Sequence, residues 1–310
     1  MDLSLRQLSV FVSVAHRLSF TAAANDLLVS QSSLSRTVAE IERVLGTSVF
    51  HRDTRNVTLT DEGRELLEVA EHVLGVHRAG MRQLRRFVDG SGGTVSVAAL
   101  PSVAAVLLPP VITAFRRRWP ETDVRIHDGL ARSVVEAVER GDADFAVTVA
   151  TDGAPWVSGR PLVRDLFVGV VPPGHPLADR DELSWADLRD EQFIAMGAGS
   201  SVRALTDLAF TQAGGAGRGV VEASSFATVG GLVSAGLGVT ALPALVRALL
   251  GFAPVEHRPL TGPVVRRGLD LLWPTDRPMS AAARRFLATI DELRSGGFEL
   301  PPDVHWAEPR

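Results

Sequence analysis

Cysteine and tyrosine are both absent from this chain of 310 residues. Without Cys, the protein has no disulfides, no Cys-ligated zinc, no thiol nucleophile and no thiol-based redox sensor. Without Tyr, no phenol is available to hydrogen-bond a ligand. Neither peroxide chemistry at a thiol nor recognition through a phenol is therefore expected.

Long apolar runs are also absent. No stretch of eighteen or more apolar residues occurs, and the N-terminus MDLSLRQLSV has an acid at its second position and no cleavable apolar segment. We therefore expect a cytoplasmic protein that does not contact a membrane. The hydrophobic content of 45% permits two or three domains with real cores.

Excess positive charge is missing as well. The net charge is −4, and residues 1–90 carry eleven Arg against eleven Asp plus Glu. This balance excludes a strongly basic domain that would bind nucleic acid through charge alone. Any DNA interface must rest on local geometry.

The first 46 residues predict three helices. Ser19 or Thr21 can cap a short second helix that continues through Leu27, and the third helix begins near Ser30. In the third helix, Leu34, Val38, Ile41 and Leu45 recur at helical spacing and face the core. The first helix is indicated by an apolar face of Leu5, Leu8, Phe11, Val12 and Ala15.

The third helix opens with more small polar side chains than a cap requires. One Ser satisfies the free N–H groups of the first turn, so Ser30 as N-cap leaves the others unexplained. In a major groove, Gln pairs with adenine, Arg with guanine, and Ser or Thr with either. The alternative is that these residues are merely solvated. The predicted DNA contacts are Ser30, Gln31, Ser32, Ser33, Ser35, Arg36 and Thr37.

A wing follows the three helices. In TSVFHRDTRNVTLT, Val49 and Phe50 begin a short strand and residues 57–59 form its return. Arg52 and Arg55 fall near the tip, where we expect them to contact the DNA backbone or minor groove. The wing makes the DNA-binding interpretation the stronger one.

These residues resemble the N-terminal signature of the LysR-type transcriptional regulators. The resemblance covers about 65 positions and includes SFTAA at 19–23, the S-Q-x-x-L-S pattern from Ser30, F-x-R at 50–52 and L-T-x-x-G at 59–63. Ser32 departs from it, because the family usually has Pro there. The resemblance implies binding to a pseudo-palindromic site on double-stranded DNA, a dimer or tetramer, and a small-molecule effector. RNA polymerase is a further candidate partner, and activation and repression both remain open.

A heptad pattern runs through residues 60–88. It indicates either a helix packed against its own chain or a seam between two subunits, and the resemblance implies the seam. His77 is expected to set the register of the seam rather than bind a metal. The predicted dimerisation residues are Leu67, Ala70, Leu74, His77, Met81, Leu84 and Val88.

After DGSGG at 89–93 the pattern changes to strands alternating with helices, which predicts an α/β domain with largely parallel strands. Two crossings, near 163–165 and 266–269, divide it into two lobes around a cleft. LPS at 100–102, PPGHPL at 172–177 and LVSAGLGVTALP at 232–243 resemble the effector domain of the same family, akin to type 2 periplasmic binding proteins. The predicted domains are a winged helix-turn-helix (1–60), a linker helix (61–89), lobe one (90–163 and 266–310) and lobe two (164–265).

Hydroxyl side chains occur at three predicted junctions between a strand and a helix. Strand ends and helix starts are where open α/β sheets hold anionic ligands. Each hydroxyl alone could be only a helix cap, but three that converge predict a carboxylate or similar anion as effector. With contacts that the resemblance implies, the predicted site comprises Leu100, Pro101, Ser102, Thr148, Gly199, Ser200, Ser201, Arg203, Ser225, Phe226 and Thr228.

Catalytic and metal-binding patterns are not found. The eight His residues form no HExxH, no Ser lies in a G-x-S-x-G elbow, and GAGSS at 197–201 lacks the Lys of a P-loop. We expect no catalytic residue, metal or cofactor. The competing interpretations are a solute-binding module and an enzyme with a fused DNA-binding domain. The first would need a secretory signal and the second a reactive group in the cleft.

Overall fold

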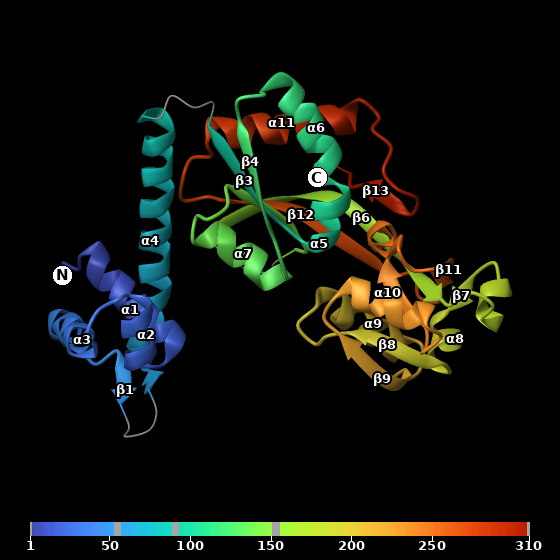
Figure 1. Ribbon diagram of the computed structural model, residues 1–310, viewed down its shortest axis with the longest axis horizontal. Helices are drawn as coiled ribbons and strands as arrows, with labels where there is room; N and C mark the ends of the chain where they lie inside the picture. The colour runs from blue at the N-terminus through green and yellow to red at the C-terminus, as the bar shows by residue number, and fades with distance from the viewer. Residues whose placement is uncertain (1, 53–56, 89–92, 151–155, 309–310) are drawn as a thin grey trace. The chain divides into compact units, whose positions relative to one another are not determined.

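The computed structural model describes residues 2–52, 57–88, 93–150 and 156–308. The chain divides into two compact units, one formed mainly by Met1–Asp89 and the other by Gly90–Val138 with Ala143–Arg310. Figure 1 labels their helices and strands. Among the helices in these ranges, none is both long and apolar enough to cross a membrane.

The N-terminal unit is a winged helix-turn-helix followed by a long helix, as predicted. Strands β1 and β2 pair antiparallel, with Phe50 opposite Leu59, and form the wing. The elements are α1 (Leu5–Arg17), α2 (Phe20–Asp26), α3 (Gln31–Leu45), β1 (Phe50–Arg52), β2 (Val57–Leu59) and α4 (Asp61–Val88).

Hydroxyl side chains begin each helix of this unit. Ser4, Ser19 and Ser30 accept hydrogen bonds from backbone N–H groups in the first turns of α1, α2 and α3. Thr60 Oγ1 does the same for α4, accepting from the N–H of Gly63 at 2.9 Å. Gly46 forms the C-cap of α3 with a φ of +74°, a left-handed conformation that glycine adopts without strain.

Aromatic rings fill the centre of this unit. Phe11 of α1 and Phe20 of α2 both contact Phe50 of β1, with ring centroids 5.3 and 5.8 Å apart. The wing lies close to α4, because a Cβ atom at Gly63 would lie only 2.0 Å from the carbonyl oxygen of Val49. Glycine at this position lets the first turn of α4 approach the strand.

Lobe one of the second unit is a sheet with helices on both faces. Phe145 of the sheet contacts Phe286 of α11, which contacts Phe115 of α6, so these helices cover one face, and α7 covers the other (Figure 1). Strands β4, β3 and β5 are parallel in that order. The elements are β3 (Thr94–Ala99), α5 (Pro101–Val106), α6 (Leu108–Arg118), β4 (Asp123–Asp128), α7 (Ala131–Glu139), β5 (Phe145–Thr148), α11 (Ala281–Ser295) and β13 (Val304–Trp306).

Lobe two is smaller and also α/β. Strands β8 and β9 pair in parallel, and helices α8, α9 and α10 pack around them (Figure 1). The elements are η1 (Pro176–Asp179), β7 (Leu183–Ser184), α8 (Trp185–Arg189), β8 (Gln192–Met196), α9 (Ser201–Gln212), β9 (Arg218–Ala223), α10 (Phe226–Ser234), β10 (Thr240–Pro243), η2 (Ala244–Leu250) and β11 (Glu256–Thr261).

Two long strands connect the lobes. Strand β6 (Val157–Val171) pairs antiparallel with β12 (Arg266–Pro274) in lobe one and with β10 and β11 in lobe two. Both predicted crossings fall where β6 and β12 pair. The expectation of largely parallel strands is wrong for this part of the sheet, because every strand beside β6 runs opposite to it.

The helical segment after β3 is interrupted. It forms two helices, α5 and α6, which meet at Leu107. Pro109 and Pro110 follow directly. Proline lacks an N–H and fits only the first turn of a helix, so a new helix begins here instead of α5 continuing.

Candidate functional site

The start of α3 carries an exposed row of polar side chains. Ser30 Oγ accepts a hydrogen bond from the Ser33 N–H at 3.2 Å and lies 3.1 Å from the Ser32 Oγ. Gln31, Ser32, Ser33 and Arg36 are exposed, whereas Ser35 and Thr37 are half-buried. Thr37 Oγ1 donates to the carbonyl of Ser33 at 3.1 Å. The side chains predicted to contact DNA therefore share one helix start.

The opposite face of α3 fixes this presentation. Leu34, Val38 and Ile41 are at most 1% exposed. Ala23 and Ala24 of α2 are also buried and, because they are small, allow α3 to pack closely. Arg36 makes no hydrogen bond or ion pair with any described residue, so its guanidinium is available to a ligand.

The wing places Arg52 at the end of β1. Its backbone pairs with Val57 of β2 in the antiparallel register. Arg55 lies outside the described residues.

Part of the predicted seam of α4 packs within the subunit. Ala70 is fully buried and Leu74 is 8% exposed, and both belong to the core that α4 shares with α1. Leu67 is half-buried against the same core. Ala70 and Leu74 therefore offer almost no surface to a second subunit, and the seam prediction is wrong for these two residues, whereas for Leu67 it stays a prediction. The heptad pattern indicated an apolar face on α4. This face packs against α1 of the same chain.

A different stripe of α4 is exposed. Val69, Val73 and Val76 recur at helical spacing and are 50%, 37% and 38% exposed. Leu84, two turns beyond Val76, continues the stripe and is 53% exposed. Of the other predicted seam residues, His77 and Met81 are also exposed, and the side chain of Val88 lies outside the described part.

A cavity of about 390 Å³ lies between the lobes. Side chains of lobe one reach it from the end of β3 and the start of α5, and those of lobe two come from the starts of α9 and α10. Its walls contain hydroxyls, aliphatic groups and the Phe226 ring. The predicted effector residues that line it are Leu100, Pro101, Ser102, Ser200, Ser201, Ser225 and Phe226.

The serines of this cavity have different local roles. Ser200 Oγ accepts a hydrogen bond from the Val202 N–H at 3.1 Å, so it caps α9 as the simpler interpretation proposed. Ser225 occupies the N-cap of α10 but makes no side-chain cap, which leaves its hydroxyl and the first N–H groups of that helix available. Ser102 is fully buried and accepts from Arg267 Nη2 at 3.0 Å.

Arg267 also lines the cavity, where it forms a buried ion pair. Its Nη2 lies 2.5 Å from Asp165 Oδ2, and the side chains are 2% and 0% exposed. Asp165 Oδ1 accepts from the Leu245 N–H at 3.0 Å, while Arg267 Nε has no partner among the described residues. Burial raises the pKa of Asp165 and lowers the pKa of Arg267, and each shift is opposed by the partner's charge.

Both units match the models of one protein family. The model for "LysR substrate binding domain" matches residues 89–294, and the model for "Bacterial regulatory helix-turn-helix protein, lysR family" matches residues 5–64. The chain belongs to the LysR family of transcriptional regulators.

Several relatives align with this regulator over nearly the whole of both chains. The uncharacterized HTH-type transcriptional regulator YfeR of Shigella flexneri is 32% identical over 300 residues, which cover 97% of this chain and 96% of YfeR. The transcriptional dual regulator GltC of Bacillus subtilis is 32% identical over 295 residues, covering 94% and 98%. The structure of full-length CbnR complexed with its target DNA has the same fold, with a TM-score of 0.64, 22% identity and coverage of 94% and 99%.

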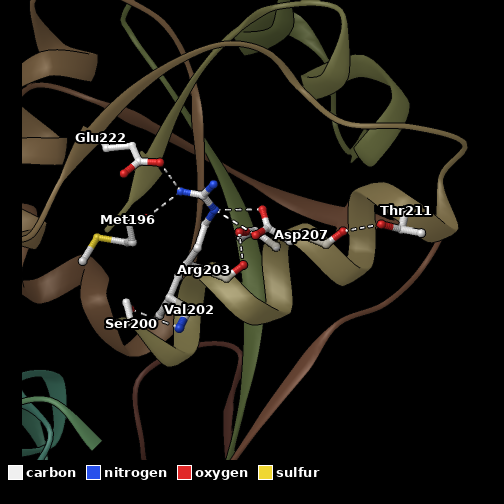
Figure 2. Close-up of polar contacts among 8 residues, drawn as sticks. Met196, Ser200, Val202, Arg203, Asp207, Thr211 and Glu222 are labelled. Atoms are coloured by element: carbon white, nitrogen blue, oxygen red, sulfur yellow. Dashed lines mark hydrogen bonds and ion pairs between the residues drawn. The ribbon is translucent and has the colours of Figure 1, made fainter. Parts of the chain in front are cut away.

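One predicted effector contact lies off the cavity wall. Arg203 does not line the cavity, and its guanidinium instead contacts Asp207, Glu222 and the Met196 carbonyl (Figure 2). Its Nη1 lies 2.6 Å from Glu222 Oε1 and its Nε 2.9 Å from Asp207 Oδ2. Hydrogen bonding to Glu222 raises the pKa of Arg203. Two carboxylates therefore already neutralise the expected counter-charge.

Three further predicted contacts lie off the cavity wall. Thr148 is fully buried in β5, and its Oγ1 has no partner among the described residues. Thr228 is exposed one residue beyond the lining part of α10. Gly199 lies beside the cavity, since a Cβ atom there would be 3.8 Å from Leu130 Cδ1, which belongs to the wall.

The structure adds lining residues that sequence reasoning missed. Asp128 ends β4 directly opposite Ala99 in the parallel register, so the strand-end rule that selected Ser102 could have found it. Arg267 carries no such signal, because it lies within β12. The additional lining residues include Asp128, Leu130, Met196, Ser224, Leu249 and Arg267.

Proposed function

We propose that this chain is a ligand-responsive regulator that binds a pseudo-palindromic DNA site as an oligomer and holds a small anionic metabolite, such as a carboxylate, in the cavity between its lobes. The observation that carries the proposal is the composition of this cavity. The buried guanidinium of Arg267 on β12 lines it, together with several hydroxyls at the starts of α5, α9 and α10. These are groups that bind oxyanions.

Arg267 replaces Arg203 as the guanidinium of the proposed effector site, with one carboxylate, Asp165, beside it instead of two. Its Nη2 is held by Asp165 and Ser102, so the fork has a fixed orientation, while Nε has no partner among the described residues. Ser201 and Ser225 supply hydroxyls that cap no helix. Leu100 and Phe226 provide an apolar wall for the body of the ligand.

Effector binding would act through β6 and β12. The ion pair between Asp165 and Arg267 joins these strands where they cross between the lobes. A ligand that contacts Arg267 and both lobes favours one lobe arrangement by its difference in affinity for the two. We propose that this change of lobe arrangement links effector binding to DNA binding. The proposed function takes place in the cytoplasm and involves no catalytic step.

DNA recognition is proposed for the start of α3. Gln31, Ser33 and Arg36 are exposed there and have the chemistry to contact base edges. Arg52 and Arg55 of the wing are proposed to contact the DNA backbone. The exposed stripe of α4, beginning at Val69, is proposed to pair with that of a second subunit.

A thermal-shift screen of small organic acids tests the effector proposal. Each acid is compared with its neutral amide, using the full chain and a Ser201→Ala/Ser225→Ala variant. Neither hydroxyl caps a helix, so the variant should fold as the parent does. We expect at least one acid to raise the melting temperature of the parent, with its amide ineffective and the shift in the variant at most about half as large.

Thr228→Ala is the matched control, because Thr228 lies on α10 outside the cavity. It should respond to the acid as the parent does. If no acid stabilises the parent, or if the double variant responds equally, the anion site is wrong. An amide that stabilises as well as its acid would assign a neutral ligand.

A further inference from the structure

A second cavity lies on the other side of the strand crossing. It has a volume of about 560 Å³ and is lined by residues of β6, β12 and β13 and by residues just after β13. Figure 1 shows these three strands together in lobe one. The residues that matter chemically are Arg164, Arg266, His305, Trp306 and Glu308. None of them lines the effector cavity.

The strand register brings three basic side chains together here. Arg164 of β6 lies opposite Gly268 of β12 on one side and opposite His305 of β13 on the other. Arg266 lies opposite Leu166, so it is a diagonal neighbour of Arg164. Because side chains alternate along a strand, Arg164 and Arg266 point away from the face that carries Asp165 and Arg267.

Gly268 allows Arg164 to lie across the neighbouring strand. A Cβ atom at this position would be 2.5 Å from Arg164 Nη1. The guanidinium therefore lies over β12, the strand that also carries Arg266, although both groups are positively charged. Like charges on neighbouring strands destabilise a sheet unless something compensates them.

No protein group compensates these charges in the described structure. Arg164, Arg266 and His305 are exposed and make no hydrogen bond or ion pair with any described residue. Glu308 is the only acid that lines the cavity. The other face of the same strands differs, because Arg267 is paired with Asp165 there.

Trp306 gives the cavity a flat apolar wall. Its indole Nε1 donates to the Phe298 carbonyl at 3.1 Å, which fixes the ring and leaves no donor for a ligand. Pro161 and Leu166 add to the apolar surface. Guanidinium groups match the geometry of carboxylates and phosphates and bind them through paired hydrogen bonds.

We propose that this groove is a second ligand site, separate from the effector cavity, which binds a small organic polyanion through Arg164, Arg266 and His305. The shared chemistry of the ligand is two or more oxyanion groups, either carboxylates or phosphates, on a compact body that contacts Trp306. The site does not depend on the proposed effector.

Calorimetric titration of the full chain with citrate and, separately, with pyrophosphate tests the proposal at constant ionic strength. We expect at least one of the two to bind the parent, and an Arg164→Gln/Arg266→Gln variant to bind it about tenfold more weakly or worse. The two probes distinguish a carboxylate site from a phosphate site. Both side chains are exposed, so the melting temperature of the variant should match that of the parent.

Two further variants separate geometry from net charge. Arg116→Gln/Arg117→Gln removes the same charge from the exposed end of α6 and should bind the anion as the parent does. Gly268→Ala keeps the charge but displaces the Arg164 guanidinium, so it should weaken binding several-fold. The Ser201→Ala/Ser225→Ala variant of the effector cavity should retain binding in full.

The proposal fails if neither probe binds, or if the Arg164→Gln/Arg266→Gln variant binds as tightly as the parent. It also fails if the α6 control loses affinity equally, because net charge alone would then attract the anion. Unchanged affinity in Gly268→Ala would also contradict the proposal, because the position of the Arg164 guanidinium would then not matter for binding. Loss of binding in the serine variant would place the anion in the effector cavity instead.

Discussion

Arg36 of the N-terminal unit and Arg267 of the effector domain have opposite surroundings. Arg36 is exposed on α3 and contacts no described residue, whereas Arg267 is 2% exposed and pairs with a carboxylate. An exposed charge contributes to recognition with little effect on folding. A buried charge affects both ligand recognition and folding stability, because removing its partner leaves an unpaired ion in the protein interior. Substitutions in the two units must therefore be judged by different measurements.

The largest expected effect follows from breaking the buried pair. Arg267→Met leaves the Asp165 carboxylate buried with only the backbone N–H groups of Leu245 and Ala244 as partners. We expect the free energy of unfolding of the effector domain to fall by about 3–5 kcal/mol. Urea denaturation of the full chain, followed by the fluorescence of the Trp residues, all of which lie in this domain, measures the change.

The matched variant removes both charges. Asp165→Leu/Arg267→Met should recover most of the lost stability, since no unpaired ion remains buried. It should still lose the response to an acidic effector. If Arg267→Met alone unfolds within about 1 kcal/mol of the parent, the pair is better solvated than its burial indicates.

Two adjacent residues of α4 give the next largest effect. Leu74 is 8% exposed in the core shared with α1, and Val73 is 37% exposed on the outer stripe. Leu74→Ala should lower the free energy of unfolding of the N-terminal unit by about 2–4 kcal/mol. Val73→Asp should leave this free energy nearly unchanged, but it should weaken self-association by placing a charge in the proposed subunit contact.

Sedimentation and thermal denaturation together separate these outcomes. A Val73→Asp protein that remains fully associated at micromolar concentration would exclude the outer stripe as the subunit contact. A Leu74→Ala protein with normal stability but lost association would restore the original heptad prediction.

The same contrast explains how far the sequence could predict this molecule. The fold of the N-terminal unit follows from local patterns, because Ser30 begins α3, Gly46 ends it, and Leu34, Val38 and Ile41 mark its buried face. Helix α4 is harder, because apolar residues occur on both of its faces. Periodicity locates such faces, but it does not say which one the chain itself covers.

The proposed effector site was predictable only where a local rule applied. Hydroxyls at helix starts were found by the strand-end rule, and Ser102, Ser200 and Ser225 do line one cavity. Arg203 also lies at a helix start, but its charge is neutralised by Asp207 on the same helix and by Glu222 on β9. Arg267 and its partner Asp165 are 102 positions apart. These residues meet because β6 and β12, which are far apart in the sequence, pair in the sheet. Such a pairing leaves no local sequence pattern.

The smallest expected change concerns Arg36, and it sharpens the contrast with Arg267. Arg36→Ala should not alter the free energy of unfolding, because the side chain has no partner among the described residues. It should weaken binding to the specific DNA site by about 1–3 kcal/mol, while non-specific binding changes little, if the guanidinium contacts a base. Fluorescence anisotropy with the specific site and with a scrambled duplex, at two salt concentrations, measures both affinities.

Arg43→Ala is the control for that measurement. Arg43 lies on the same helix near its C-terminal end, so the variant loses the same charge away from the proposed base contacts. It should keep the ratio of specific to non-specific affinity. Equal losses on both duplexes for Arg36→Ala would assign this residue to the phosphate backbone, and base recognition would then rest on Gln31 and Ser33 at the start of α3.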